Sequence, residues 1–224
     1  GTAQLWKNIY SETKDSAVLE IQIDYKGKKE TIKKPVDYFH GINTKTLKTS
    51  YVKPEIVDIA FVVDATGSMQ DEINFLKEEM NDIISKTKTK YEKIDLYIGS
   101  LFYRCQGNSY VTKHKSLTKD YDQVTSFIKE QNAGEGGTES VEIALEVSIA
   151  QLEWHPEART RLLFLVLDEP AGYHDTIIQK LHTQIQLAAK KGIKIIPVVA
   201  SGKVGSEDQN RKMEYLMRSM ALAT

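Results

Sequence analysis

The chain has 224 residues, 41% of them hydrophobic, which suits one α/β domain with a small extension. This apolar content is typical of soluble globular proteins and argues against disorder throughout the chain. The 30 Lys and Arg residues nearly balance the 31 Asp and Glu residues, and the formal net charge of −1 argues against general nucleic-acid binding. Cys105 is the single cysteine, which excludes an intramolecular disulfide and a Cys-rich zinc site.

The first quarter of the chain differs in pattern from the rest. Residues 17–25 alternate apolar and polar side chains, which is the period of a half-buried strand. The Lys-Gly-Lys segment at 26–28 is a turn signal, and residues 29–34 complete a predicted hairpin. Residues 35–54 show no sustained period. We therefore predict that residues 1–54 form a β-hairpin extension and a linker.

Strands and helices alternate from residue 55 onward. The β-rich run 56–63 is nearly continuously apolar, as in strands buried on both faces of a parallel sheet. The next elements are a helix at 71–87 and an antiparallel edge hairpin with strands at 93–104 and 110–117. The remaining predicted elements are helices 120–132, 138–154, 175–191 and 207–223 and strands 161–167 and 193–200. This order predicts an α/β, doubly wound, mostly parallel sheet with one antiparallel edge strand and helices on both faces.

Polar residues follow several of these strands. Asp64, Thr66 and Ser68 come after the first core strand, Thr138 opens a predicted helix, and Asp168 follows strand 161–167. Ligands of such sheets gather at the carboxyl ends of the strands, so these side chains are expected to converge. Each signal alone is weak, because an Asp at a strand end is common and a Ser or Thr can simply cap the next helix. Together they offer hard oxygen donors, which suit Mg²⁺ or Mn²⁺ better than zinc or copper.

The segment 61–69, Phe-Val-Val-Asp-Ala-Thr-Gly-Ser-Met, resembles the metal-ion-dependent adhesion site (MIDAS) of von Willebrand factor type A (vWA) domains. The usual form of that loop is Asp-x-Ser-x-Ser, and Thr66 keeps the hydroxyl of the middle Ser. The Gly-Gly-Thr segment at 136–138 resembles the second loop of the site, and Asp168 matches the acidic residue that ends the fourth core strand. The resemblance covers roughly residues 55–224 and is closest to bacterial vWA proteins.

The resemblance implies a role for each residue of the site. Thr66 and Ser68 would bind the ion through their hydroxyls, and Asp64 and Asp168 would act mainly through water or as outer acceptors. Thr138 would contact the ion directly or through water. The implied ion is Mg²⁺, or Mn²⁺ or Ca²⁺ in its place. The implied function is a non-enzymatic binding module whose ion accepts an Asp or Glu from a protein partner.

The sequence departs from the family pattern at three places. Cys105 stands where the bacterial branch usually has an Asp, and Glu169 adds bulk and charge beside the site. The domain at 55–224 would lack its last strand, which either lies in residues beyond 224 or is replaced by the N-terminal region. No segment resembles a signal peptide, and the longest apolar run, 162–167, is far too short to span a bilayer. Export to the periplasm or cell surface is expected slightly more than a cytoplasmic location.

Enzymatic alternatives lack essential residues. A haloacid dehalogenase-type phosphotransferase needs a second Asp where Thr66 stands, and Ser68 lacks the flanking glycine of a hydrolase nucleophile elbow. The Gly-rich segment 134–138 lacks the lysine of a phosphate-binding Walker loop. Two hypotheses stay open: a metal-dependent binding module, and a chiefly structural domain of a larger bacterial envelope or regulatory protein with a vestigial metal site.

Overall fold

The structure is a computed structural model that describes residues 18–25, 28–35, 54–169, 171–172, 174–200 and 207–224. The chain divides into two compact units, Gly1–Val52 and Lys53–Thr224. In the first unit, β1 (Val18–Tyr25) pairs antiparallel with β2 (Lys28–Pro35), with Tyr25 opposite Lys28. Most of the predicted turn at 26–28 and of the predicted linker at 35–54 lies outside the described residues.

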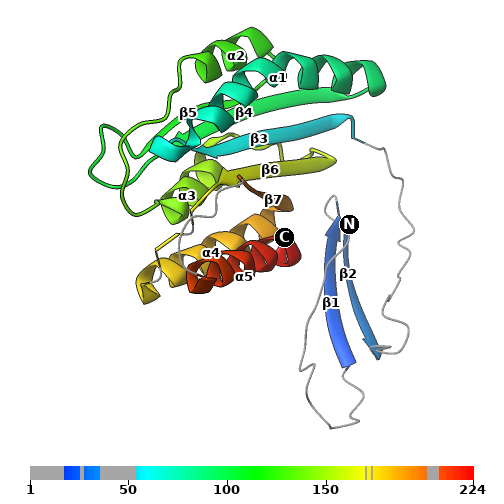
Figure 1. Ribbon diagram of the computed structural model, residues 1–224. Helices are drawn as coiled ribbons and strands as arrows, with labels where there is room; N and C mark the ends of the chain where they lie inside the picture. Colours follow the sequence, from blue (N-terminus) through cyan, green and yellow to red (C-terminus); the bar gives the residue numbers. More distant parts are fainter. Residues whose placement is uncertain (1–17, 26–27, 36–53, 170, 173, 201–206) are drawn as a thin grey trace. The chain divides into compact units, whose positions relative to one another are not determined.

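The second unit is built on a five-stranded sheet in the order β5-β4-β3-β6-β7 (Figure 1). β3, β4, β6 and β7 run parallel, and β5 is antiparallel to β4 at one edge. The strands are β3 (Ile56–Asp64), β4 (Asp95–Tyr103), β5 (Thr112–Thr118), β6 (Thr160–Leu167) and β7 (Ile193–Val199). The predicted doubly wound, mostly parallel sheet with one antiparallel edge strand is confirmed.

Helices cover both faces of the sheet (Figure 1). One face carries α1 (Gln70–Lys90) and α2 (Tyr121–Lys129). The other carries α3 (Val141–Gln151), α4 (Asp175–Lys191) and α5 (Glu207–Ala223). Within the described ranges, no helix is both long enough and apolar enough to cross a bilayer.

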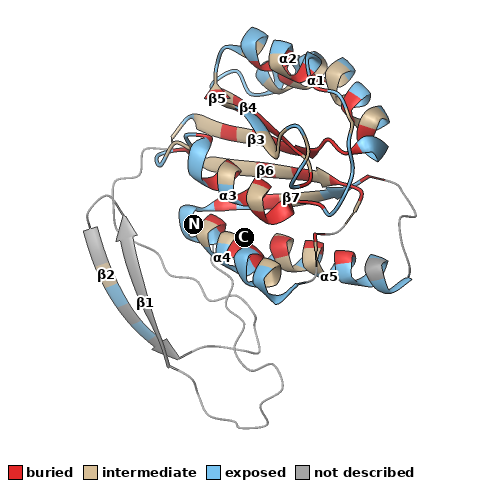
Figure 2. Ribbon diagram, turned by 90° about the vertical axis from the view of Figure 1, so that its left-hand side faces the viewer, coloured by how far each residue is buried: buried red, intermediate tan, exposed pale blue. Residues whose placement is uncertain are grey.

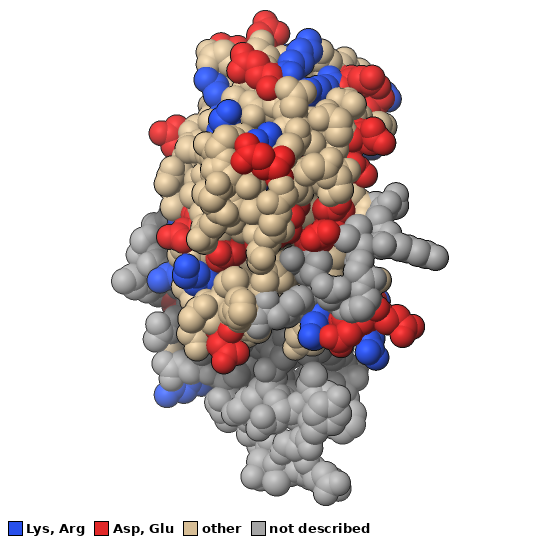
Figure 3. Space-filling model, turned by 60° about the vertical axis from the view of Figure 1, so that its left-hand side comes forward, with Lys and Arg blue, Asp and Glu red and all other residues tan. Residues whose placement is uncertain are grey.

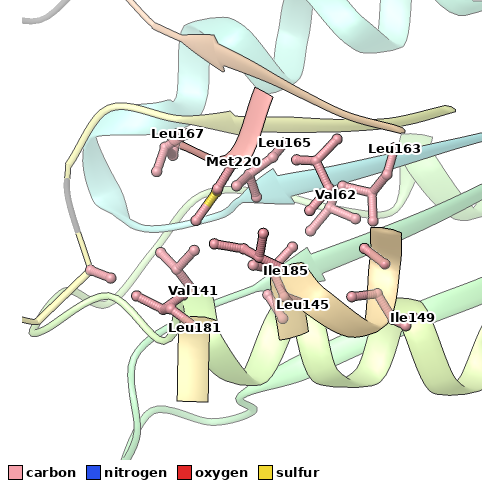
Figure 4. Packing of buried hydrophobic residues seen from close by; sticks show 14 of the residues in the cluster. Val62, Val141, Leu145, Ile149, Leu163, Leu165, Leu167, Leu181, Ile185 and Met220 are labelled. Carbon is pink, nitrogen blue, oxygen red and sulfur yellow. The ribbon is translucent and has the colours of Figure 1, made fainter. Parts of the chain in front are cut away.

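The apolar core lies in two layers, one on each face of the sheet. Along β6, Leu163, Leu165 and Leu167 pack beneath α3, α4 and α5, whereas Phe164 and Val166 join the cluster beneath α1 and α2. Figure 4 shows the first layer, in which strand and helix side chains interdigitate. Buried residues line the strands and the inner helix sides (Figure 2). The period-2 alternation therefore sends successive side chains of β6 into opposite layers.

Most predicted helices end close to their observed limits. Gly192 closes α4 in the left-handed conformation (φ 66°, ψ 31°). The predicted helix 138–154 is the exception, because α3 begins at Val141. Ser140 takes the N-cap position, and Gly137 has a φ of 151°. Thr138 and Glu139 therefore belong to the loop before the helix, and this places them at the edge of the sheet.

β3 is the central strand, between the half of the sheet that holds β4 and β5 and the half that holds β6 and β7. β4 lies on one side of β3 and β6 on the other, with Asp64 opposite Tyr103 and Val63 opposite Val166. The carboxyl ends of β3 and β6 therefore lie side by side at the point where the strand order reverses. Such a switch point is the usual place for a ligand in an open α/β sheet.

Candidate metal centre at the carboxyl ends of β3 and β6

Asp64 ends β3 and is fully buried. Its Oδ1 accepts two hydrogen bonds from Thr66, one from the backbone N–H at 2.8 Å and one from the hydroxyl at 2.8 Å. Its Oδ2 is buried without a hydrogen-bond partner. One oxygen thus fixes the loop, and the other is left for a group that the protein itself does not supply.

Asp168 follows the neighbouring strand β6 and is also buried. Its Oδ1 has no hydrogen-bond partner, and its charge adds to the factors that raise the pKa of Asp64. Two aspartates on adjacent strand ends therefore each hold a buried, unpartnered oxygen. Buried carboxylate oxygens normally find a donor or a cation, because leaving them unpaired is costly.

The other predicted ligands lie on exposed segments. Ser68 is exposed within a one-turn 3-10 helix, Gly67–Met69, that leads into α1. Thr138 is exposed in the loop before α3, and its Cγ2 lies 3.1 Å from the position that a Cβ on Gly172 would occupy. Among the described side chains, neither hydroxyl is hydrogen bonded to Asp64 or Asp168. The structure thus brings Asp64, Thr66 and Asp168 together and leaves Ser68 and Thr138 with free hydroxyls on two nearby loops.

Glu139 is a site residue that the sequence analysis did not identify. It is 3% exposed, and its carboxyl interacts directly with Asp64 and Thr66. Burial, followed by the charge of Asp64, raises the pKa of Glu139 to about 9, and burial raises the pKa of Asp64 to about 6. Glu139 therefore holds a proton at neutral pH, and its Oε2, like Oδ2 of Asp64, is buried without a hydrogen-bond partner. Its position directly after Thr138, before an apolar helix, was the available signal.

Two further residues beneath the site are held neutral. Burial and the charge of Asp64 raise the pKa of the Tyr103 phenol well above its ordinary value, and its hydroxyl has no partner. Burial, followed by the charge of Glu139, raises the pKa of the Cys105 thiol to about 11. Cys105 is 2% exposed and lies under Gly137, where a Cβ would come within 3.1 Å of the Cβ of Cys105. Cys105 is thus a buried thiol that stays protonated at neutral pH.

Arg104 holds the loop that follows β3. Its Nε donates to the Ala65 carbonyl at 3.2 Å, and its Nη2 donates to the Asn132 carbonyl at 2.9 Å. The Gly134 N–H donates to the same Ala65 carbonyl at 3.1 Å, and Nη1 of Arg104 lies 3.6 Å from a carboxylate oxygen of Glu135. The backbone beside Asp64 is therefore fixed from two separate loops.

The donor set fits a hard divalent cation. Among the described residues, no three His, Cys, Asp or Glu side chains are grouped so as to hold a metal ion. A site made of two aspartates and three hydroxyls contains only two such side chains. The Thr66 hydroxyl donates its hydrogen to Asp64, so the lone pairs of its oxygen stay available to coordinate an ion. In the described part of the structure, no hydrogen-bond donor faces the buried oxygens Oδ2 of Asp64 and Oδ1 of Asp168 to balance their negative charge. An oxygen-preferring ion would supply the balancing positive charge.

The comparisons with known proteins agree with this fold. The family model of the von Willebrand factor A domain matches residues 58–222. The chain belongs to this family, and its predicted membership is confirmed. Along 147 residues, or 63% of the chain, it is 27% identical to the alpha-protein kinase vwkA of Dictyostelium discoideum, and the match spans 22% of that protein.

Solved structures show the same fold. The pilus adhesin SpaC of Lactobacillus rhamnosus GG, in its open conformation, matches 78% of the chain with a TM-score of 0.56 and 15% identity. A second crystal structure of SpaC matches 76% with a TM-score of 0.53 and 16% identity. The matched regions are 27% and 28% of those chains. The chain thus spans about a quarter of the length of the proteins that it resembles.

Proposed function

We propose that this vWA domain is a non-enzymatic protein-binding module that holds a divalent cation at the carboxyl ends of β3 and β6. The ion is Mg²⁺, or Mn²⁺ or Ca²⁺ in its place, and Asp64, Thr66, Ser68, Thr138 and Asp168 surround it. The observation that carries this proposal is the pair of buried aspartates with unpartnered oxygens on adjacent strand ends.

The partner would supply an Asp or Glu carboxylate to the ion. A site with two carboxylates, partly engaged by Thr66, leaves a divalent ion with residual positive charge, and the exposed Ser68 and Thr138 loops leave it accessible. The adhesin fold of the structural neighbours supports protein binding and an exported or cell-surface location. Lys and Arg are interspersed with Asp and Glu on the face in Figure 3, which supports a protein rather than a nucleic-acid partner.

A chiefly structural domain is the second candidate. The absence of a group of three metal-binding side chains among the described residues favours it. In that case the proton held by Glu139 would relieve the repulsion between the two carboxyl groups, and no ion would be needed. The two candidates differ in one measurable property, which is the affinity of the protein for Mg²⁺ and Mn²⁺.

Titration calorimetry with Mg²⁺ and Mn²⁺ tests the proposal. We expect saturable binding by the wild type and at least a tenfold loss in Asp64→Asn, because the amide removes the negative charge. Asp64→Asn also removes a buried carboxylate, so its ion-free form is expected to melt at or above the wild-type temperature.

Asp58→Asn is the matched control. Asp58 is an equally buried aspartate on β3, about 20 Å along the strand from Asp64, and its two oxygens contact His155 at 2.8 and 2.9 Å. This variant should lose stability and keep its ion affinity. Absence of binding by the wild type at millimolar ion, or equal loss in both variants, would refute the metal site and favour the structural role.

A further inference from the structure

Phe75 projects from the outer side of α1 and is 65% exposed. The inner side of the same helix buries Ile73, Met80 and Ile84 in the apolar core beneath α1 and α2. Phe75 lies on the opposite side of the helix from these residues and does not belong to the core clusters. Exposed aromatic side chains are common anchors for a protein partner, because their burial removes a large apolar surface from water.

Carboxylates surround Phe75 on the helix surface. Residues three and four positions apart on a helix are neighbours, and all of these neighbours of Phe75 are acidic and accessible: Asp71, Glu72, Glu78 and Glu79. Among the described residues, none of the four forms an ion pair. Lys77 donates to Asn132 at 3.1 Å, and the other nearby cation of α1, Lys86, pairs with Asp82. The helix surface around Phe75 therefore carries an excess of negative charge.

Two lysines at the other end of α1 lie over aromatic rings. Lys88 Nζ is 5.0 Å from the centre of the Tyr121 ring, and Lys90 Nζ is 5.6 Å from that of Tyr91. In the part of the chain that the structure describes, the Phe75 ring has neither a cation nor an aromatic ring beside it. The face of an aromatic ring attracts cations, and the surrounding carboxylates add to this attraction. Phe75 and its neighbours therefore suit a positive charge that comes from another molecule.

We propose that the Phe75 surface, which consists of Phe75 and its four acidic neighbours, binds an arginine-rich segment of a protein partner. One guanidinium would stack on the Phe75 ring and pair with the carboxylates beside it. Arginine suits this surface better than lysine, because its planar group stacks on a ring while its N–H groups bind carboxylates. No residue of the Phe75 surface belongs to the candidate metal centre, so the proposal does not depend on the ion.

Fluorescence anisotropy of a dye-labelled hexa-arginine peptide, titrated with the full chain in the absence of divalent ions, tests the proposal. We expect saturable binding by the wild type. Phe75→Leu should weaken binding about twofold to fivefold, because leucine is apolar but has no ring face for the cation. The double variant Glu72→Gln with Glu79→Gln should weaken it about threefold to tenfold, because two of the four negative charges are removed.

Tyr91→Leu and the double variant Glu153→Gln with Glu157→Gln are the matched controls. Tyr91 is an aromatic residue at the end of α1, 48% exposed, and Glu153 and Glu157 are exposed in the loop before β6. Both controls should bind the peptide like the wild type. Absence of saturable binding, or equal loss in a variant and its control, would overturn the proposal. A loss in the Glu72 and Glu79 variant without any loss in Phe75→Leu would also overturn it, since the ring would then have no part in binding.

Discussion

Asp64 and Glu139 place two carboxyl groups in contact inside a buried site. Neither has a basic side chain among its interacting partners. The pKa of Glu139 is raised first by its burial and then by the negative charge of Asp64, so Glu139 keeps its proton. Such a pair does not add to the stability of the folded protein, since apolar residues of similar size in its place would make the protein at least as stable. Strongly shifted pKa values of this origin are concentrated at functional sites, and this supports a binding role for the strand ends.

The ion-free protein should lose stability as the pH rises. Asp64 and Glu139 have pKa values of about 6 and about 9 in the folded chain, above their unfolded values of 3.8 and 4.5. The folded state therefore keeps protons that the unfolded state has released, and the free energy of unfolding falls from about pH 4 to about pH 9. Each group contributes a slope of at most about 1.4 kcal/mol per pH unit. Chemical denaturation at several pH values measures this slope.

Glu139→Gln should flatten this dependence above pH 6, because the amide does not titrate. Glu146→Gln, an exposed position on α3, is the control and should leave the slope unchanged. Saturating Mg²⁺ should also flatten the wild-type curve, since a cation favours both ionised carboxylates. A wild-type stability that rises with pH over this range would contradict the assigned pKa directions.

At the level of the elements, the sequence predicted the strands and helices well and the loops poorly. The apolar periods located β3, β6 and α4 within a residue or two, because burial on the sheet faces dictates those residues. The start of α3 was misplaced, since Thr138 and Glu139 read as helix residues in sequence. Their loop conformation depends on Gly137 lying over Cys105, which follows β4, and a contact between segments so far apart in sequence has no local pattern.

The loop after β3 should depend on Arg104 for its position. Arg104→Lys removes the planar group that contacts the carbonyls of Ala65 and Asn132 together, so the Asp64 loop should be held less tightly. We expect Mg²⁺ affinity to fall about threefold to tenfold with little change in the far-ultraviolet circular dichroism spectrum. Titration calorimetry gives the affinity.

Arg161→Lys serves as the control for this change. Arg161 also donates to two backbone carbonyls, those of His155 and Pro156, but it lies at the start of β6. This variant should lose stability without a change in ion affinity. Unaltered affinity in Arg104→Lys would show that the loop is fixed by the Thr66–Asp64 hydrogen bonds alone.

At the level of the whole molecule, the unit Lys53–Thr224 has its own sheet, two core layers and the complete candidate site. A fragment of residues 53–224 should therefore fold cooperatively and bind Mg²⁺ like the full chain. Differential scanning calorimetry and titration calorimetry of both chains provide the comparison. A fragment that shows no cooperative transition would mean that residues 1–52 contribute to the core of the domain.

The fold class was predictable from the sequence because it rests on repeated patterns over the whole chain. The site was predictable in part. Asp64, Thr66 and Asp168 followed from their places at strand ends, and the structure brings them together. Glu139 and Arg104 were not identified, since their roles depend on burial and on contacts between loops. The further strand expected for this domain, the closeness to bacterial relatives and the domain limits stay predictions.

We propose above all that Asp64 and Asp168 hold a divalent cation between adjacent strand ends. A crystal structure of the chain grown with Mn²⁺, with anomalous diffraction recorded at the manganese edge, tests it most directly. We expect one strong anomalous peak surrounded by oxygens of Asp64, Thr66, Ser68, Thr138 and Asp168 or by waters bound to them. A well-ordered site without a peak, with Glu139 still against Asp64 at saturating Mn²⁺, would contradict the claim.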